Sequence, residues 1–258
     1  MRSSNPVLTR LSPANYSQGG YAPPSSPGAS YPSPVIPAVS DRMTVDDVVV
    51  RTVGLLALTV ASAAIAWAIV PLSATGAVWI VAMLIGLVLG FVISFSRVTN
   101  PALVGTYAVV EGVFLGMVSK AFEYAYSGIV LQAVLATVGV FFVMSLLYRS
   151  RVIRATPRFN KILFGCLAGA SVLILGNLLL WAFGINTALN GNGPIAVIFS
   201  LAMVVIGALS FITDFDLIER AVAQGAPKRL AWTCSFGLLV GLIFVYIYIL
   251  RLIAIARN

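Results

Sequence analysis

Long runs of apolar residues fill the chain from residue 45 onward, and polar breaks separate them at regular intervals. A helix needs roughly 20 apolar residues to cross the hydrocarbon core of a bilayer. Seven runs meet this requirement, and they predict membrane-spanning helices near residues 50–70, 74–96, 101–121, 128–148, 160–184, 193–213 and 230–253. The pattern therefore predicts an all-α fold, a polytopic membrane protein whose residues 45–258 form a bundle of seven transmembrane helices.

Residues 1–44 have a different composition from the rest of the chain. They contain eight of the 13 prolines, many Ser and Gly residues, and three interspersed tyrosines. Such a segment buries too little apolar surface to offset the entropy of ordering it, so we expect a disordered, cytoplasmic N-terminal tail. The alternative is that its SYPSP and YAPPSSP segments bind a partner in an extended polyproline conformation.

The composition narrows the class of protein. Hydrophobic residues make up 60% of the chain and charged residues 9%, which is too few charges to cover a water-soluble globule. Histidine is absent, which excludes His-based triads and HExxH zinc sites, and no GxSxG motif occurs. We therefore expect no enzyme and no cofactor. Cys166 and Cys234 lie inside apolar runs, and both are expected to be small buried side chains.

The net charge of +8 is distributed unevenly over the predicted loops. Lipid bilayers favour Lys and Arg on the cytoplasmic side, so this charge indicates membrane loops and not nucleic-acid binding. With the N-terminus inside, three basic residues lie outside (Lys120, Arg251, Arg257), and thirteen lie on the cytoplasmic side: Arg2, Arg10, Arg42, Arg51, Arg97, Arg149, Arg151, Arg154, Arg158, Lys161, Arg220, Lys228 and Arg229. We expect a multi-pass protein of the cell membrane with a cytoplasmic N-terminus. A re-entrant last segment remains an alternative, because it would return Arg251 and Arg257 to the inside.

Pairs of glycines spaced four residues apart occur in four of the predicted helices. Such pairs allow helix backbones to approach closely in a membrane. They predict a tightly packed bundle and not a specific dimer, and they are Gly86/Gly90, Gly112/Gly116, Gly165/Gly169 and Gly237/Gly241.

Acidic residues within the membrane region are the candidates for chemistry. Glu111 lies about midway along the third span, where an ionised acid must be paired, protonated or hydrated, and Tyr107 one turn earlier can donate a hydrogen bond to it. Asp214 and Asp216 end the sixth span but point about 200° apart on a helix, so they do not automatically form one site. These three acids are candidates for a gate, a weak cation site or a pH sensor, with no defined set of metal ligands. The alternative is that they are interfacial anchors paired with Arg220, Lys228 or Arg229.

Three blocks of the chain resemble the Bax inhibitor-1 family, and most closely its bacterial YccA-like branch. The blocks are VVEGVFLGMVSKAFE, GIVLQAVLATVGVFFVMSLLYRS and ALSFITDFDLIERAVAQGAPKRLAWTCSFGLLV, and the resemblance covers roughly residues 45–256. It implies a seven-helix bundle with the last helix near the centre. In some members it implies a pH-sensitive calcium leak gated by two acids, on the sixth and seventh helices. In others it implies regulation of partner membrane proteins, including a membrane protease.

The chain departs from the family pattern in the seventh span. The sixth-span aspartate of the family matches Asp214, but residues 230–258 contain no acid. The expected second aspartate falls at about Gly241, and Tyr248 stands where some related sequences place a glutamate. A latch of two acids is therefore not expected. The predicted function is a pH-sensitive cation leak in the bilayer, with Ca²⁺ as the permeant or weakly bound ion. The alternative is a non-conducting regulator or scaffold that acts on a membrane-protein partner, such as a membrane protease.

Overall fold

The computed structural model describes residues 42–95, 100–185 and 187–257, and the predicted disorder of residues 1–41 lies outside them. Within the described residues, seven helices are long and apolar enough to cross a membrane, as predicted. A short 3₁₀ turn, η4 (Leu72–Ala74), precedes the second of them. The helices are α1 (Val45–Ile69), α2 (Thr75–Phe95), α3 (Pro101–Ala125), α4 (Ile129–Arg149), α5 (Pro157–Ala182), α6 (Pro194–Ala223) and α7 (Leu230–Ala256).

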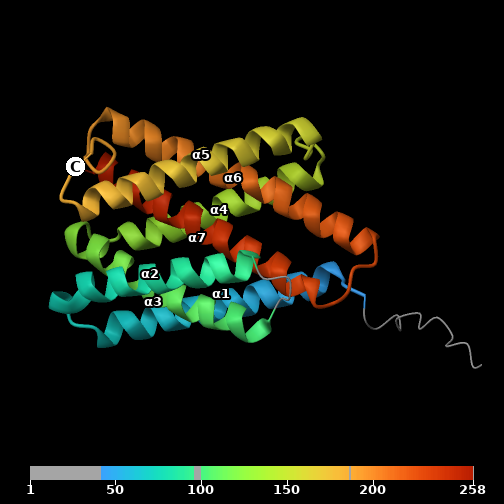
Figure 1. Cartoon of the computed structure of the whole chain (residues 1–258), viewed down its shortest axis with the longest axis horizontal. Helices are drawn as coiled ribbons and strands as arrows, with labels where there is room; N and C mark the ends of the chain where they lie inside the picture. Colours follow the sequence, from blue (N-terminus) through green and yellow to red (C-terminus); the bar gives the residue numbers. More distant parts are fainter. Residues whose placement is uncertain (1–41, 96–99, 186, 258) are drawn as a thin grey trace, which may run out of the picture. The chain divides into compact units, whose positions relative to one another are not determined.

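Helix α7 is the centre of the bundle. It packs against α1, α3, α4 and α6, and it carries more buried residues than any other described helix (Figure 1). Two buried hydroxyl contacts hold it in place. Ser235 donates to the carbonyl oxygen of Val48 in α1 at 3.0 Å, and the hydroxyls of Tyr246 and Ser119 in α3 lie 2.6 Å apart. A central last helix is what the family resemblance implied.

Small residues allow the helices to approach, as three of the four glycine pairs predicted. A Cβ atom placed on Gly112 of α3 would lie 1.8 Å from Ser62 Oγ of α1, and one on Gly116 would lie 2.6 Å from the Ala63 carbonyl oxygen. The prediction is wrong for the pair Gly165/Gly169. Among the described atoms nothing lies within 4 Å of a Cβ at either position, because α5 packs chiefly against α6.

The outer surfaces of the helices are apolar. Large side chains that a water-soluble protein would bury are exposed along α2, α4 and α5, among them Val88, Leu135 and Phe164. This surface suits contact with lipid. Cys234 is buried as predicted, but Cys166 is exposed, so that prediction is wrong. The physical reason is that Cys166 lies on α5, most of whose surface is exposed outside the bundle.

Two residues that precede α1 also belong to the packed bundle. The Met43 side chain is buried, and its backbone N–H donates to the Ala226 carbonyl oxygen at 2.8 Å. Thr44 caps α1, since its hydroxyl accepts from the Asp47 N–H while the Asp47 carboxylate accepts from the Thr44 N–H. Met43 and Thr44, which the sequence analysis assigned to the tail, therefore contact the helical bundle and cap its first helix.

Helix α6 is longer than predicted, and it continues ten residues beyond the expected end at residue 213. The ion pair between Asp216 and Arg220, spaced four residues apart, stabilises this polar extension. The helix ends at Ala223, and Gly225 follows with a φ of +66°, a conformation that glycine adopts readily. Asp214 and Asp216 thus lie within a helix and not in a loop.

The last helix crosses the whole bundle. Arg257, directly after α7, donates to the Ser127 carbonyl oxygen and to Gln132 Oε1, both at 2.9 Å. Ser127 lies in the turn between α3 and α4, at the end of the bundle opposite the start of α1 (Figure 1). A re-entrant last segment, the alternative considered above, does not fit this arrangement.

Candidate functional site

Asp214 is a half-buried carboxylate on the side of α6 that faces the central helix. The last residue of α6 is nine positions further along the helix, which places Asp214 roughly 14 Å inside the helix end. No described residue forms a hydrogen bond or an ion pair with its side chain. Arg220, Lys228 and Arg229, its proposed basic partners, therefore do not neutralise it.

The α7 residue opposite Asp214 is a glycine. A Cβ atom on Gly237 would lie 3.7 Å from Asp214 Oδ1, and the buried Cys234 lies one turn away, within electrostatic reach of the same carboxylate. The family resemblance placed the missing second acid at about Gly241, but that position does not face Asp214 in the structure. A Cβ on Gly241 would instead lie 2.9 Å from the ring of Phe211.

Asp216 lies apart from Asp214, as the 200° separation predicted. Its Oδ2 lies 2.8 Å from Nε of Arg220, one turn later on the same helix. Arg220 also reaches the Ala155 carbonyl oxygen at 3.4 Å, which links α6 to the segment before α5. Asp216 is therefore paired with Arg220, as the alternative reading of the sequence proposed, and it does not share an ion pair or hydrogen bond with Asp214.

Glu111 lies at the contact between α3 and α2. Its Oε1 would be 2.8 Å from a Cβ atom on Gly86, so the absence of a side chain at Gly86 makes room for the carboxylate. The Tyr107 hydroxyl interacts with the carboxylate from one turn earlier, as the spacing predicted. Tyr107 itself is buried, with its ring against Phe236 of α7. Glu111 thus has a hydrogen-bonding partner, in contrast to Asp214.

A cluster of charges that the sequence did not reveal joins the start of α1 to the turn before α7. Lys228 Nζ lies 3.1 Å from Asp47 Oδ1, and Arg51 donates to the Lys228 carbonyl oxygen at 3.1 Å. The Arg51 guanidinium also lies over the ring of Trp232, 5.2 Å from its centroid. Asp47 and Lys228 are 181 positions apart in the sequence, and no pattern in the sequence indicated their contact.

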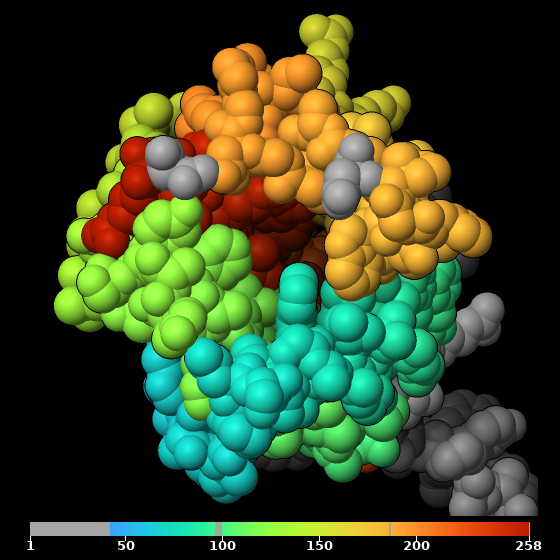
Figure 2. Space-filling view, turned by 90° about the vertical axis from the view of Figure 1, so that its left-hand side faces the viewer, coloured from blue at the N-terminus to red at the C-terminus, as the bar shows by residue number. Residues whose placement is uncertain are grey.

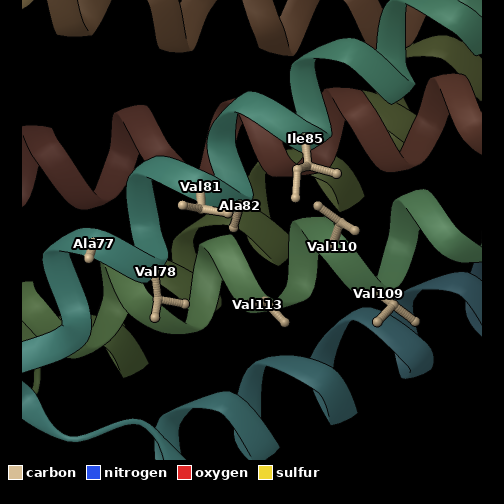
Figure 3. Close-up of a pocket in the computed structure, with 8 residues that line it drawn as sticks. All are labelled: Ala77, Val78, Val81, Ala82, Ile85, Val109, Val110 and Val113. Atoms are coloured by element: carbon tan, nitrogen blue, oxygen red, sulfur yellow. The ribbon is translucent and has the colours of Figure 1, made fainter.

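The described residues contain no group of three or more His, Cys, Asp or Glu side chains that could hold a metal ion. An apolar groove of about 350 Å³ lies between α2 and α3 (Figure 3). Its lining includes Val78, Ile85 and Val113 and no charged side chain, so it suits contact with lipid chains and not ion binding.

Comparison with known proteins agrees with the resemblance noted in the sequence. The family model described as Bax inhibitor 1 like matches residues 5–258, which is nearly the whole chain. No curated protein matches the chain. The family match does not specify a branch, so the YccA-like assignment stays a prediction. The chain belongs to the Bax inhibitor 1 like family.

Proposed function

We propose that this member of the Bax inhibitor 1 like family is a passive cation leak pathway that admits Ca²⁺, with Asp214 as its controlling acid. The observation that carries the proposal is the environment of Asp214. A half-buried carboxylate without a cation or hydrogen-bond donor among the described residues is costly inside a membrane protein. Such residues line ion paths or proton relays far more often than they stabilise a fold.

A single acid suits transient binding of a cation. Ca²⁺ takes six to eight oxygen ligands, of which Asp214 supplies at most two. Gly237 across from it supplies no side chain, so water molecules would complete the coordination shell. The resulting affinity is low, which favours passage of the ion over its retention. Protonation of Asp214 removes the charge that attracts the cation, and this makes the leak sensitive to pH.

The proposal is tested by reconstituting the protein into liposomes that contain a calcium-sensitive dye. We expect an inward Ca²⁺ gradient to give a faster rise in fluorescence than in liposomes without protein. A matched sample of an unrelated polytopic membrane protein controls for leakiness caused by reconstitution. If neither Ca²⁺ nor K⁺ enters faster than in this control at any pH, the leak proposal fails.

A second candidate function is regulation of a membrane-protein partner, such as a membrane protease. One observation favours it: five basic residues in and beside the turn between α4 and α5 are exposed and form no ion pair with another described residue. They are Arg149, Arg151, Arg154, Arg158 and Lys161. This surface suits an acidic segment of a partner or anionic lipid headgroups.

We also infer that the N-terminus is cytoplasmic and that the protein lies in the cell membrane. The support is the distribution of the described basic residues. Ten of them lie at the end of the bundle where α1 begins. The remaining three lie in the opposite half of the bundle, and they are Lys120, Arg251 and Arg257. Cytoplasmic loops carry the excess of Lys and Arg.

A further inference from the structure

The end of the bundle where α7 terminates has an excess of positive charge, and not all of its charged side chains have hydrogen-bond partners. The described charged residues there are Lys120, Glu123, Arg251 and Arg257. Lys120 Nζ donates to the carbonyl oxygens of Trp67 and Val70, at 2.7 and 2.6 Å.

The other two outer charges also have partners. Arg257 binds the α3–α4 turn as described above, and the Glu123 carboxylate accepts from the Val130 N–H at 3.1 Å at the start of α4. Arg251 alone among these four has no hydrogen-bond or ion-pair partner among the described residues.

Arg251 is half-buried and lies within the last two turns of α7. A guanidinium carries five N–H donors, and burying them without acceptors is unfavourable. Tyr248, one turn earlier, carries no carboxylate, and its ring packs against Phe244 and Phe199. The acceptor that Arg251 lacks therefore has to come from outside the described chain.

A polar pocket of about 230 Å³ opens beside Arg251. Its other walls come from Phe122 and Tyr126 near the end of α3 and from residues 190–192 of the α5–α6 loop. Figure 2, which views this end of the bundle, shows it hollowed, with α7 visible in the recess between α2, the α3–α4 turn and the α5–α6 loop.

The pocket also offers neutral hydrogen-bond donors. The Asn190 side-chain oxygen accepts from the Asn177 amide at 2.7 Å, which leaves the Asn190 amide group free to donate. Tyr126, whose side chain carries a hydroxyl, also lines the pocket. No acid is among the lining residues, so the pocket combines a guanidinium with neutral donors and suits an anion with several oxygens.

We propose that this pocket binds a phosphate group, with Arg251 donating two parallel hydrogen bonds to its oxygens. Planar guanidinium groups bind phosphate in this bidentate way, and the geometry favours Arg over Lys. Because Arg251 lies five residues before the end of a membrane-spanning helix, the pocket is near the level of lipid headgroups. The phosphate can come from a phospholipid headgroup or from a free phosphate ion, and the chemistry of recognition is the same.

The proposal is tested by thermal unfolding of the delipidated protein, followed by the fluorescence of its four tryptophans. The additions are short-chain phosphatidylglycerol, the diacylglycerol with the same acyl chains but no phosphate, and sodium phosphate against sodium chloride of equal ionic strength. We expect phosphatidylglycerol to raise Tm and diacylglycerol not to. An equal rise with sodium phosphate identifies a free anion as the ligand, and no rise with it identifies the lipid.

Two variants assign the site. Arg251→Gln should abolish the rise in Tm, whereas Arg257→Gln, which removes a cation that already has acceptors, should retain it. Without additions, Arg251→Gln should unfold at a Tm no lower than that of the parent, because it removes an unsatisfied charge. Should Arg251→Gln not fold, Asn192→Leu narrows the pocket and should likewise lose the rise. The proposal is overturned if neither phosphate source raises the Tm of the parent. It is also overturned if the Tm of Arg251→Gln rises as much as that of the parent, or if the Tm of Asn192→Leu does so where Arg251→Gln does not fold.

Discussion

Gly112 shows how single residues determine the packing of this bundle. The atoms of α1 nearest to its missing side chain include the backbone carbonyl oxygen of Thr59, at 2.4 Å from an ideal Cβ position. Backbone cannot move aside as a flexible side chain does, so a methyl group there would push α1 and α3 apart. Gly86 has the same role for a polar group, because it leaves the space that the Glu111 carboxylate occupies.

We predict that Gly112→Ala destabilises the protein by about 1–3 kcal/mol, the usual effect of overpacking, despite the better helix propensity of alanine. Gly105→Ala is the matched control, since it lies on the same helix and nothing is within 4 Å of its Cβ position. It should leave the stability unchanged or raise it by up to about 1 kcal/mol. Thermal unfolding in one detergent checks both variants, and equal Tm values for the two would contradict the packing described here.

At the scale of the elements, the sequence was sufficient to predict the number and order of the helices. Each span is an apolar run bounded by polar residues. Three of the observed helices begin with a proline, because the first residue of a helix needs no N–H donor: Pro101, Pro157 and Pro194. The predicted end of the sixth helix, at residue 213, was too early because the polar residues that follow it were taken to lie outside the helix. Polar residues continue a helix into the interface when they pair with each other, as Asp216 and Arg220 do.

The candidate site was predictable in part. The separation of Asp214 from Asp216 follows from helical periodicity alone, and the structure confirms it. The partner of each acid depends on the register between helices, which periodicity does not determine. For this reason Gly237, and not Gly241, faces Asp214, and the contact of Lys228 with Asp47 was not foreseen.

This register predicts where a second acid would act. Gly237→Asp should place a carboxylate opposite Asp214 and raise the affinity for Ca²⁺ by about tenfold or more, because calcium affinity depends on the number of charged ligands. Gly241→Asp should give no such gain and should lower the stability, since its side chain meets the Phe211 ring. Equilibrium dialysis with radioactive calcium measures both. A gain for Gly241→Asp without one for Gly237→Asp would show that the register is different.

On the scale of the whole molecule, seven crossings place successive loops on alternate sides of the membrane. The α4–α5 turn and the start of α1 share one end of the bundle, and the α5–α6 loop and Arg257 share the other. The excess of basic residues at the first end is the basis for the inferred cytoplasmic N-terminus.

Labelling of single cysteines tests this orientation. In a background with Cys166→Ser and Cys234→Ser, cysteines are introduced at the exposed positions Ser150 and Asn190. An impermeant thiol reagent added to intact cells should label the variant at 190 and not the variant at 150. A further cysteine added after Asn258 should label like the one at 190. The reverse pattern would mean that the N-terminus is outside, and equal labelling of all three would contradict the seven crossings.

The central claim is that the charge of Asp214 controls the passage of cations through the bundle, and flux in liposomes at several pH values measures it most directly. In the parent, flux should rise with pH, because deprotonated Asp214 attracts cations. Asp214→Asn should have a low flux at every pH, whereas Asp216→Asn, which removes only the ion pair with Arg220, should follow the parent. An Asp214→Asn variant with the flux and pH dependence of the parent would contradict the account.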